Sequence, residues 1–267
     1  MIHLINAELL KIRTTWTAWG LLIALVPLVA LNAFIQFATY HFATPENQPP
    51  GSPPPPALTD PQAIRGVLSG ALSAKTLVLL LGILMITAEF RHMTVTPTFL
   101  SSPQRSMVVG AKLGAGVIIG VVFAAAALLV DVATGYICYA IVGETFTLNV
   151  DKAPQAILGI FLVITVYALI GIGLGALLKN QIAAILVGLG WNLAAEPLAS
   201  TLLSLWHHQG DKIYRYFPGN AASAVTDRFL GGDFALLKPW QGAVVLLLYA
   251  VVFAALGARL TMRRDVT

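Results

Sequence analysis

The sequence predicts an all-α integral membrane protein that crosses the bilayer six times. Of its 267 residues, 57% are hydrophobic and 10% are charged, whereas roughly 25% of the residues of a soluble domain are charged. Six apolar runs reach the length of about 20 residues that a helix needs to cross a hydrocarbon core of about 30 Å. These runs are continuous and do not alternate with period two, which is typical of membrane helices and not of barrel strands.

The six predicted spans form a single transmembrane domain, residues 1–267. The third is longer than one crossing needs, so we expect it to tilt or to project into the interfaces. We expect the first to be retained, because its apolar run is longer than the roughly 7–15 residues of a signal peptide and no small-x-small cleavage site closes it. The spans are residues 17–40, 67–88, 107–142, 156–178, 182–204 and 241–260.

The distribution of basic residues predicts that both termini lie in the cytoplasm. In this orientation nine of the sixteen Lys and Arg residues fall on the inner side, and cytoplasmic loops carry an excess of these residues. This orientation also assigns each connecting segment to one side of the membrane. We expect a Pro-rich loop at 41–66 and an aromatic-rich loop at 205–240 on the outside, and a polar segment at 89–106 on the inside.

Residues 1–16 predict an amphipathic helix that lies in the inner interface ahead of the first span. Apolar and charged residues alternate there at helical spacing. An ordinary juxtamembrane anchor is the plainer interpretation of this helix taken alone. The apolar positions are Leu4, Ile5, Leu9 and Ile12, and the charged positions are Glu8, Lys11 and Arg13.

The chain lacks the sequence motifs of enzymes and of ATP-binding proteins. A phosphate loop requires two glycines ahead of its Lys, and Ser69 and Ala74 stand at those positions before Lys75. Neither H-E-x-x-H nor G-x-S-x-G occurs, and no basic stripe with interleaved aromatics indicates a nucleic-acid partner. No metal site is predicted either. The one local group of potential ligands, interpreted as chance neighbours, is His207, His208 and Asp211.

Among the ionisable residues within the predicted spans, where charge is costly and often marks a pathway, the candidates for a pathway are Lys75, Asp131 and Glu196. One interpretation places Asp131 and Glu196 at the outer headgroup level, with Lys75 snorkelling or pairing with one of them. In the alternative interpretation all three line the path of an ATP-independent carrier or channel, although no inverted repeat is apparent. A third possibility is a membrane anchor or sensor whose outer loops bind a ligand.

The inner segment 89–106 is too polar to span the membrane, yet it has apolar anchors. From Glu89 to Arg105 it reads Glu-Phe-Arg-His-Met-Thr-Val-Thr-Pro-Thr-Phe-Leu-Ser-Ser-Pro-Gln-Arg. Glu89 and Arg91 lie where the second span ends, and the centre of the segment is apolar. We expect a short helix between prolines that lies against the membrane and faces a cytoplasmic partner.

This segment, the six-span layout and the amphipathic N-terminal helix resemble the membrane subunit of type-2 ABC exporters, especially bacterial drug and peptide-resistance permeases. The resemblance covers essentially the whole chain in layout. In specific residues it depends on Glu89 to Arg105, with weaker support from Tyr216 to Asn220 before the last span. Met93 departs from the pattern, because these permeases often have Gly there.

The resemblance implies a permease subunit that forms the translocation path of an exporter in the plasma (inner) membrane of a bacterium. Two cytoplasmic ABC ATPase subunits would drive it and would bind ATP and Mg²⁺, with no cofactor on this chain. A second permease copy or a paralogue and membrane lipid would be the other partners. The resemblance also implies a cytoplasmic coupling helix and short re-entrant helices on the outer side.

The resemblance assigns roles to three groups of residues. Charge-assisted bonds from Glu89 or Arg91, together with a Phe wedge, fit a contact that is stiff enough to transmit thrust. The ATPase-contact group is Glu89, Phe90, Arg91, His92, Thr94, Phe99 and Arg105; the N-terminal helix group is Glu8, Lys11 and Arg13; and the outer cap is Pro218, Gly219 and Asn220.

Overall fold

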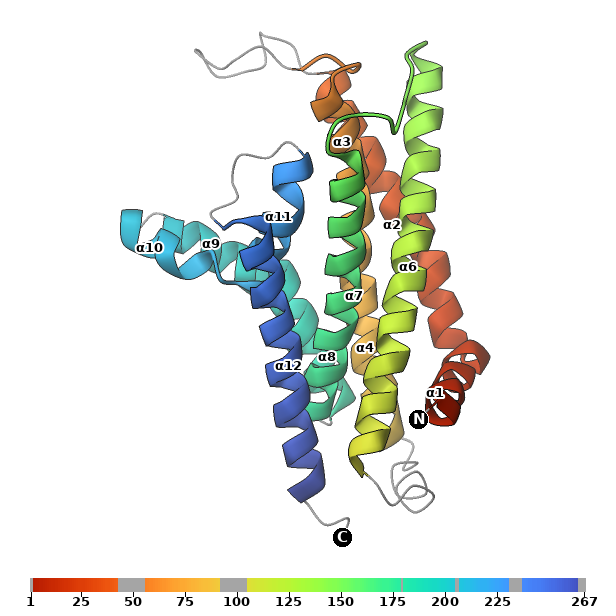
Figure 1. Ribbon diagram of the computed structural model, residues 1–267, viewed down its shortest axis with the longest axis vertical. Coiled ribbons are helices and arrows are strands. Elements are labelled where there is room, and N and C mark those ends of the chain that lie inside the picture. Colours follow the sequence, from red (N-terminus) through yellow and green to blue (C-terminus); the bar gives the residue numbers. More distant parts are fainter. Residues whose placement is uncertain are drawn as a thin grey trace.

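The computed structural model describes residues 2–42, 56–91, 105–178, 180–204, 207–230 and 237–263. Within these ranges the chain is helical and contains no strand. Figure 1 shows an elongated bundle whose helices run along its long axis. Six helices are long and apolar enough to cross a membrane by length and composition. The prediction of an all-α, multi-pass membrane protein is confirmed.

Four of the six spanning helices are continuous. They are α2 (Trp16–His41), α6 (Arg105–Ile141), α7 (Ala153–Leu178) and α12 (Pro239–Arg263). The helix α6 is much longer than a bilayer crossing, because its 37 residues at about 1.5 Å each measure roughly 55 Å. The third span therefore exceeds the hydrocarbon thickness, as its apolar run indicated.

The other two spanning helices are interrupted. The second span, Pro61–Arg91, consists of α3 (Pro61–Leu68), the 3₁₀ turn η2 (Ser69–Ser73) and α4 (Ala74–Arg91). The fifth, Gln181–Leu203, consists of α8 (Gln181–Gly190), the π-helical turn η3 (Trp191–Ala195) and α9 (Glu196–Ser204). The π turn ends two residues before Pro197, whose ring would clash with the carbonyl four residues earlier in a regular α-helix.

The centre of the bundle is α7, and small residues allow its neighbours to approach closely. In α7, 61% of the most apolar window is buried, against 22% in α2 and in α12. A Cβ on Gly171 would collide with the Leu79 carbonyl of α4, and a Cβ on Gly173 would lie 2.7 Å from Phe253 Cβ of α12. The glycine series of α7 thus serves helix packing on two faces.

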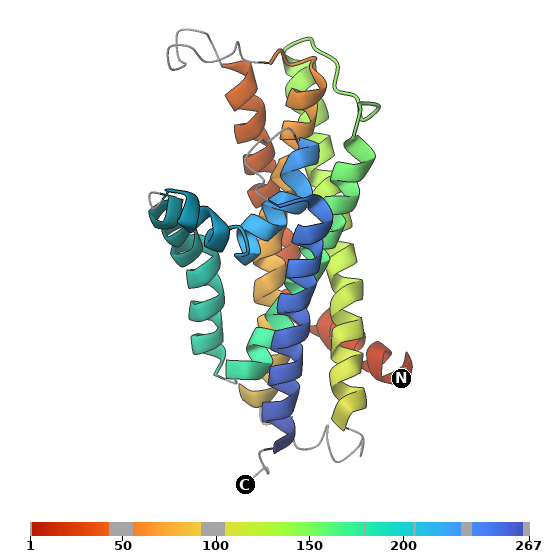
Figure 2. The ribbon, with the colours of Figure 1, turned by 60° about the vertical axis from the view of Figure 1, so that its left-hand side comes forward.

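The helix α1 (Ile2–Thr14) lies at the lower end of the bundle, where both chain termini are found (Figures 1 and 2). Its apolar residues Leu9 and Ile12 pack against the main core, while Ile2 and Leu10 are exposed. Gly114 of α6 lies against α1, because a Cβ added there would lie 3.0 Å from Ile5 Cδ1.

Two further helices, α10 (His207–Tyr214) and α11 (Pro218–Leu230), occupy most of the segment expected as an outer loop at 205–240. Both figures place α9, α10 and α11 beside the bundle, lower than the upper ends of α2 and α6 (Figures 1 and 2). Half of the Pro-rich loop 41–66 (residues 43–55) lies outside the described residues, as do residues 92–104 of the predicted coupling segment 89–106.

Candidate functional site

Four charged side chains join three helices at the lower end of the bundle. Glu8 and Lys11 come from α1, Glu89 from the last turn of α4, and Lys112 from the start of α6. We call these four residues the charge cluster. Lys112 Nζ lies 2.8 Å from Glu8 Oε2 and 2.6 Å from Glu89 Oε1. Lys11 Nζ lies 2.9 Å from Glu8 Oε1 and 2.9 Å from Glu89 Oε1.

The members of the charge cluster differ in burial. The Lys112 side chain is 6% exposed, that of Glu8 9%, that of Glu89 14% and that of Lys11 49%. Two carboxylates and two ammonium groups balance each other, so no net charge is buried. Removing one partner of a buried pair leaves an uncompensated charge, which costs about 3–5 kcal/mol. The cluster therefore fixes α1 to both α4 and α6.

The electrostatics of α1 keep its two cluster residues ionised. Burial alone would raise the pKa of Glu8, but the charges and hydrogen bonds of Lys112 and Lys11 lower it overall. Burial would likewise lower the pKa of Lys11, and its bonds to the Glu8 and Glu89 carboxylates raise it overall. At neutral pH Glu8 is an anion and Lys11 a cation, as the ion pairs require.

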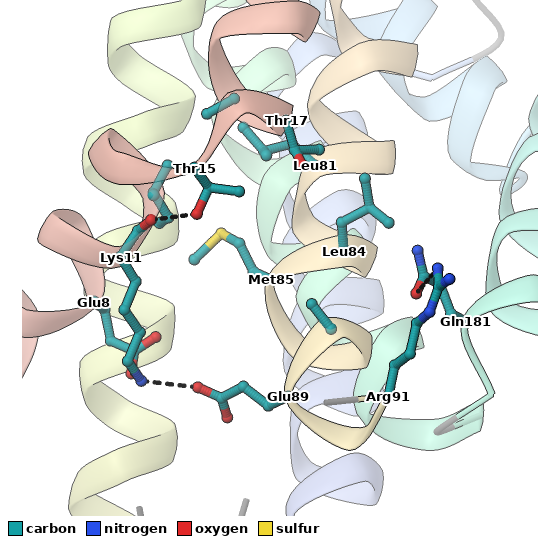
Figure 3. Close-up of a pocket in the computed structure, with 13 residues that line it drawn as sticks. Glu8, Lys11, Thr15, Thr17, Leu81, Leu84, Met85, Glu89, Arg91 and Gln181 are labelled. Carbon is teal, nitrogen blue, oxygen red and sulfur yellow. Dashed lines mark hydrogen bonds and ion pairs between the residues drawn. The ribbon is translucent and has the colours of Figure 1, made fainter. Parts of the chain in front are cut away.

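A groove of about 470 Å³ opens beside the charge cluster, between α1, α4 and the start of α8. Figure 3 shows its apolar side chains, Leu84 and Met85 among them, above the charged ones. On its far side, Arg91 Nη1 donates a hydrogen bond of 3.3 Å to Gln181 Oε1. The last turn of α4 thus contacts α1 through Glu89 and α8 through Arg91.

The structure brings together only part of the group assigned to the ATPase contact. Glu89 lies in the charge cluster and Arg91 lies exposed beside it. Phe90 lies between them in the last turn of α4, half-buried. Arg105 begins α6, but its side chain is outside the described part of the chain. Also outside it are His92, Thr94 and Phe99.

The N-terminal helix group is divided as well. Glu8 and Lys11 belong to the charge cluster, whereas the Arg13 side chain is exposed. The Arg13 carbonyl accepts a hydrogen bond of 2.9 Å from Trp19 Nε1, which ties the end of α1 to α2. Glu8, at 7% exposed, lies on the packed side of α1 and not on a solvated face.

Sequence reasoning missed Lys112 as a site residue. Lys112 counts as one more inner basic residue in the charge distribution, and its partner Glu8 lies 104 positions away along the chain. One signal was present, because Lys112 stands within an otherwise apolar run, where a charge needs a partner. The sequence does not indicate which carboxylate is that partner.

A second polar cluster forms around Glu196 in the upper part of the bundle. Glu196 is 4% exposed, and its Oε1 accepts hydrogen bonds from the backbone N–H groups of Gly219 and Asn220. Its Oε2 accepts one of 3.1 Å from Trp191 Nε1. Pro218 supplies the first residue of α11, where a missing N–H costs nothing. Glu196 therefore caps the N-terminus of α11 with a charge that suits the helix dipole.

Gly219 and Asn220, which were predicted to form an outer cap, thus contact Glu196, which was predicted to be a charge within a span. Asn220 extends the connection, because its Nδ2 donates to Ser200 Oγ at 2.9 Å and to the Tyr214 carbonyl at 2.8 Å. Three helices, α9, α10 and α11, are fixed to one another at this point. We call Glu196, Gly219 and Asn220 the upper cap.

An apolar cavity of about 330 Å³ lies next to the upper cap, and Glu196 and Tyr167 are among its lining residues. The Lys75 ammonium lies 5.4 Å from the centre of the Tyr167 ring, close enough for a cation–π interaction. Nearby, Asn192 of the π turn donates a hydrogen bond of 2.8 Å to Thr76 of α4. Lys75 and Glu196 thus have defined surroundings, whereas Asp131 lies apart from both in α6.

No protein-family model matches the chain. No curated protein matches it either. Among the described residues, no group of three His, Cys, Asp or Glu side chains is placed to hold a metal ion. Function must therefore be inferred from the charge cluster, the upper cap and the motif from Glu89 to Arg105.

Proposed function

We propose that this chain is the permease subunit of an ATP-binding cassette exporter, which forms the translocation path and is driven by separate ATPase subunits. One observation carries the proposal. The charge cluster ties the N-terminal helix α1 to the last turn of α4 and to α6. These are the elements that must move together if a cytoplasmic partner pushes on this end of the bundle.

The position of the charge cluster suits the transmission of force. Residues 92–104 connect the end of α4 to the start of α6. Glu89 precedes this segment by one turn, and Lys112 follows the start of α6 by about two turns. A thrust on the segment would reach Glu89 and Lys112 directly and α1 through Glu8. Charge-assisted bonds are short and strong enough to transmit such a thrust between the helices.

The remaining parts of the proposal follow from charge and exposure. The end that carries the charge cluster faces the cytoplasm of a bacterium, in agreement with the excess of Lys and Arg there. Two ATPase subunits bind ATP and Mg²⁺ on that side. The exposed apolar faces of α2, α8 and α12 contact membrane lipid or a second permease copy, and the helices α10 and α11 lie beside the outer half of the path.

The test is purification of the tagged full-length chain from its native membranes in mild detergent. We expect an ATPase with a phosphate-loop motif to co-purify and the complex to hydrolyse ATP. Arg91→Ala should lower this turnover several-fold while the six helices stay inserted, because Arg91 is exposed and lies outside the charge cluster. Glu89→Ala should lower it as well. Lys212→Ala, an exposed basic residue of α10, is the matched control and should keep full turnover.

Wild-type turnover in both Arg91→Ala and Glu89→Ala would contradict the coupling role. A second candidate function is an ATP-independent carrier or channel, and the buried carboxyl of Asp131 is the observation that favours it. The two candidates differ in their energy source. Transport by the chain alone in nucleotide-free vesicles would support the carrier, whereas transport that needs both ATP and the co-purified ATPase would support the exporter.

A further inference from the structure

Asp131 is a buried acidic residue within a spanning helix. It is fully buried in α6, and neither carboxylate oxygen has a hydrogen-bond partner among the described residues. The backbone of Ala71 faces the carboxyl without completing a hydrogen bond to it. This differs from Glu8 and Glu196, whose oxygens accept hydrogen bonds from cations or from backbone N–H groups.

The carboxyl of Asp131 lies where three helical segments meet. A Cβ on Gly70 would collide with Asp131 Oδ1 and would lie 2.7 Å from the Ala33 backbone nitrogen. Gly70 belongs to η2 and Ala33 to α2, so the acid is enclosed between a 3₁₀ turn and a neighbouring backbone. The absence of a side chain at Gly70 is what makes room for it.

The site lies inside the apolar part of the bundle. Ala33 is four to five residues beyond the midpoint of α2, Trp16–His41, which at 1.5 Å per residue is about 7 Å along the helix axis. Half of a hydrocarbon core measures about 15 Å. If α2 is centred on the bilayer, Asp131 therefore lies within the hydrocarbon layer and not at the headgroups.

The charged and titratable groups named next, on the elements around Asp131, have other neighbours, and Tyr40 of α2 lies with its hydroxyl against Gly66 of α3. On α2 the His41 ring stacks on Phe37; on α3 Arg65 donates to the Asp151 carbonyl; and Lys75 of α4 lies over Tyr167 of α7. On α6 itself the Tyr139 hydroxyl donates to the Leu58 carbonyl. An ionised carboxylate with no counter-charge in such surroundings is so costly that the group takes up a proton instead.

We infer that Asp131 and the 3₁₀ turn Ser69–Ser73 form a proton-binding site within the membrane, in which Asp131 is the neutral acid. A neutral carboxyl has one O–H donor, and the 3₁₀ turn offers acceptors. Ser69 and Ser73 donate to the carbonyls of Gly66 and Gly70. Ser69 Oγ already accepts a hydrogen bond from Gln36 Nε2 of α2, and the Ser73 oxygen keeps acceptor capacity. The turn interrupts the second span at the level of the acid, which is typical of functional hinges. This site goes beyond the proposed exporter function and does not depend on it.

A membrane-soluble carbodiimide tests the inference, since it reacts with protonated carboxyls in apolar surroundings. The acid proton moves to a carbodiimide nitrogen and the carboxyl oxygen bonds to the central carbon. The resulting O-acylisourea rearranges to a stable N-acylurea, so the whole reagent is added and no group leaves. The probe is dicyclohexylcarbodiimide, applied to the full-length protein in phosphatidylcholine vesicles, with the adduct located by peptide mass spectrometry.

We expect an adduct on Asp131 whose rate of formation falls as the pH is raised above neutrality. Glu8 and Glu89, which are ion-paired with Lys11 and Lys112 in the folded protein, are internal controls and should stay unmodified. Asp131→Asn should lose the adduct and also an infrared band of a protonated carboxyl, whereas Asp131→Glu should retain both. The wild-type adduct and band can be measured even if Asp131→Asn does not fold.

Two results would overturn the inference. One is a folded wild-type protein with neither an Asp131 adduct nor a protonated-carboxyl band. The other is protection of Asp131 by sodium or potassium ions at constant pH, which would show that a metal cation and not a proton occupies the site.

Discussion

The charge cluster and the upper cap each bury a glutamate, but they stabilise it in different ways. Glu8 is paired with two ammonium groups that come from α1 and α6. Glu196 is paired with backbone N–H groups at the start of α11 and with Trp191 Nε1. The first arrangement connects three helices through side chains that can separate and re-form. The second fixes a short helix to its neighbour through the backbone.

The difference has mechanical consequences. A link made of flexible Lys and Glu side chains transmits force while it lets helices shift by small amounts. A capped helix N-terminus has little such freedom, because the donors are part of the backbone. We therefore expect the lower end to be the moving part of the proposed exporter and the upper cap to be the fixed part.

The largest expected effect comes from Lys112→Met, which removes the buried cation of the charge cluster. Glu8 and Glu89 would then share only the half-exposed Lys11, so the free energy of unfolding should fall by about 3–5 kcal/mol. Denaturant titration in detergent micelles measures this change. Lys212→Met on α10 is the surface control, with an expected change within about 0.5 kcal/mol.

The double variant Glu8→Gln with Lys112→Met sharpens this result. It leaves Glu89 paired with Lys11 and no unpaired carboxylate on α1, so part of the lost stability should return. A double variant that is less stable than Lys112→Met alone would contradict a role of charge balance.

A smaller effect is expected for Glu196→Gln in the upper cap. Glutamine keeps one acceptor oxygen but loses the charge. Its amide nitrogen, which would replace Oε2, cannot accept the hydrogen bond that Trp191 Nε1 donates. Loss of a charged N-terminal cap should lower the free energy of unfolding by about 1–2 kcal/mol. Exchange of the backbone amide hydrogens should increase in α11 more than in the other helices. The exposed Glu144→Gln is the control, and equal exchange in the two variants would refute the capping role.

The sequence was sufficient to predict the helices but not their polar contacts. Continuous apolar runs defined the six spans, and the alternation around Glu8 predicted α1. The partners of Glu8 and Glu196 on other helices, Lys112 and Gly219, could not be predicted, because they lie 104 and 23 positions away and depend on how the helices pack. Both interrupted spans contained a local sign of the interruption, Pro197 in the fifth and the stretch from Ser69 to Ser73 in the second. A mean hydropathy taken over a whole span does not register such a local change.

Short helices on the outer side were expected only from the family resemblance, and the residues of α10 and α11 gave no helical signal of their own, for a related reason. Their aromatic and polar composition is that of an interfacial loop, and neither is long enough to give a strong helical period. Pro218 was interpreted as part of an outer cap motif, although a proline can equally begin a helix. The capping acid that favours a helix here, Glu196, belongs to another element.

The smallest expected effect is the acid sensitivity of the charge cluster. The folded pKa of Glu8 is lowered from its ordinary value of 4.5, so its contribution to stability is present above that value and is lost as the pH falls through the folded pKa. The difference in Tm between the wild type and Glu8→Gln should be constant near neutrality and should shrink below pH 4.5. Because Lys11 and Lys112 both keep Glu89 as a partner when Glu8 is neutralised, we expect a smaller change than in Lys112→Met. A difference in Tm that persists unchanged in strong acid would mean that packing of α1, and not its ion pairs, accounts for the contribution of Glu8.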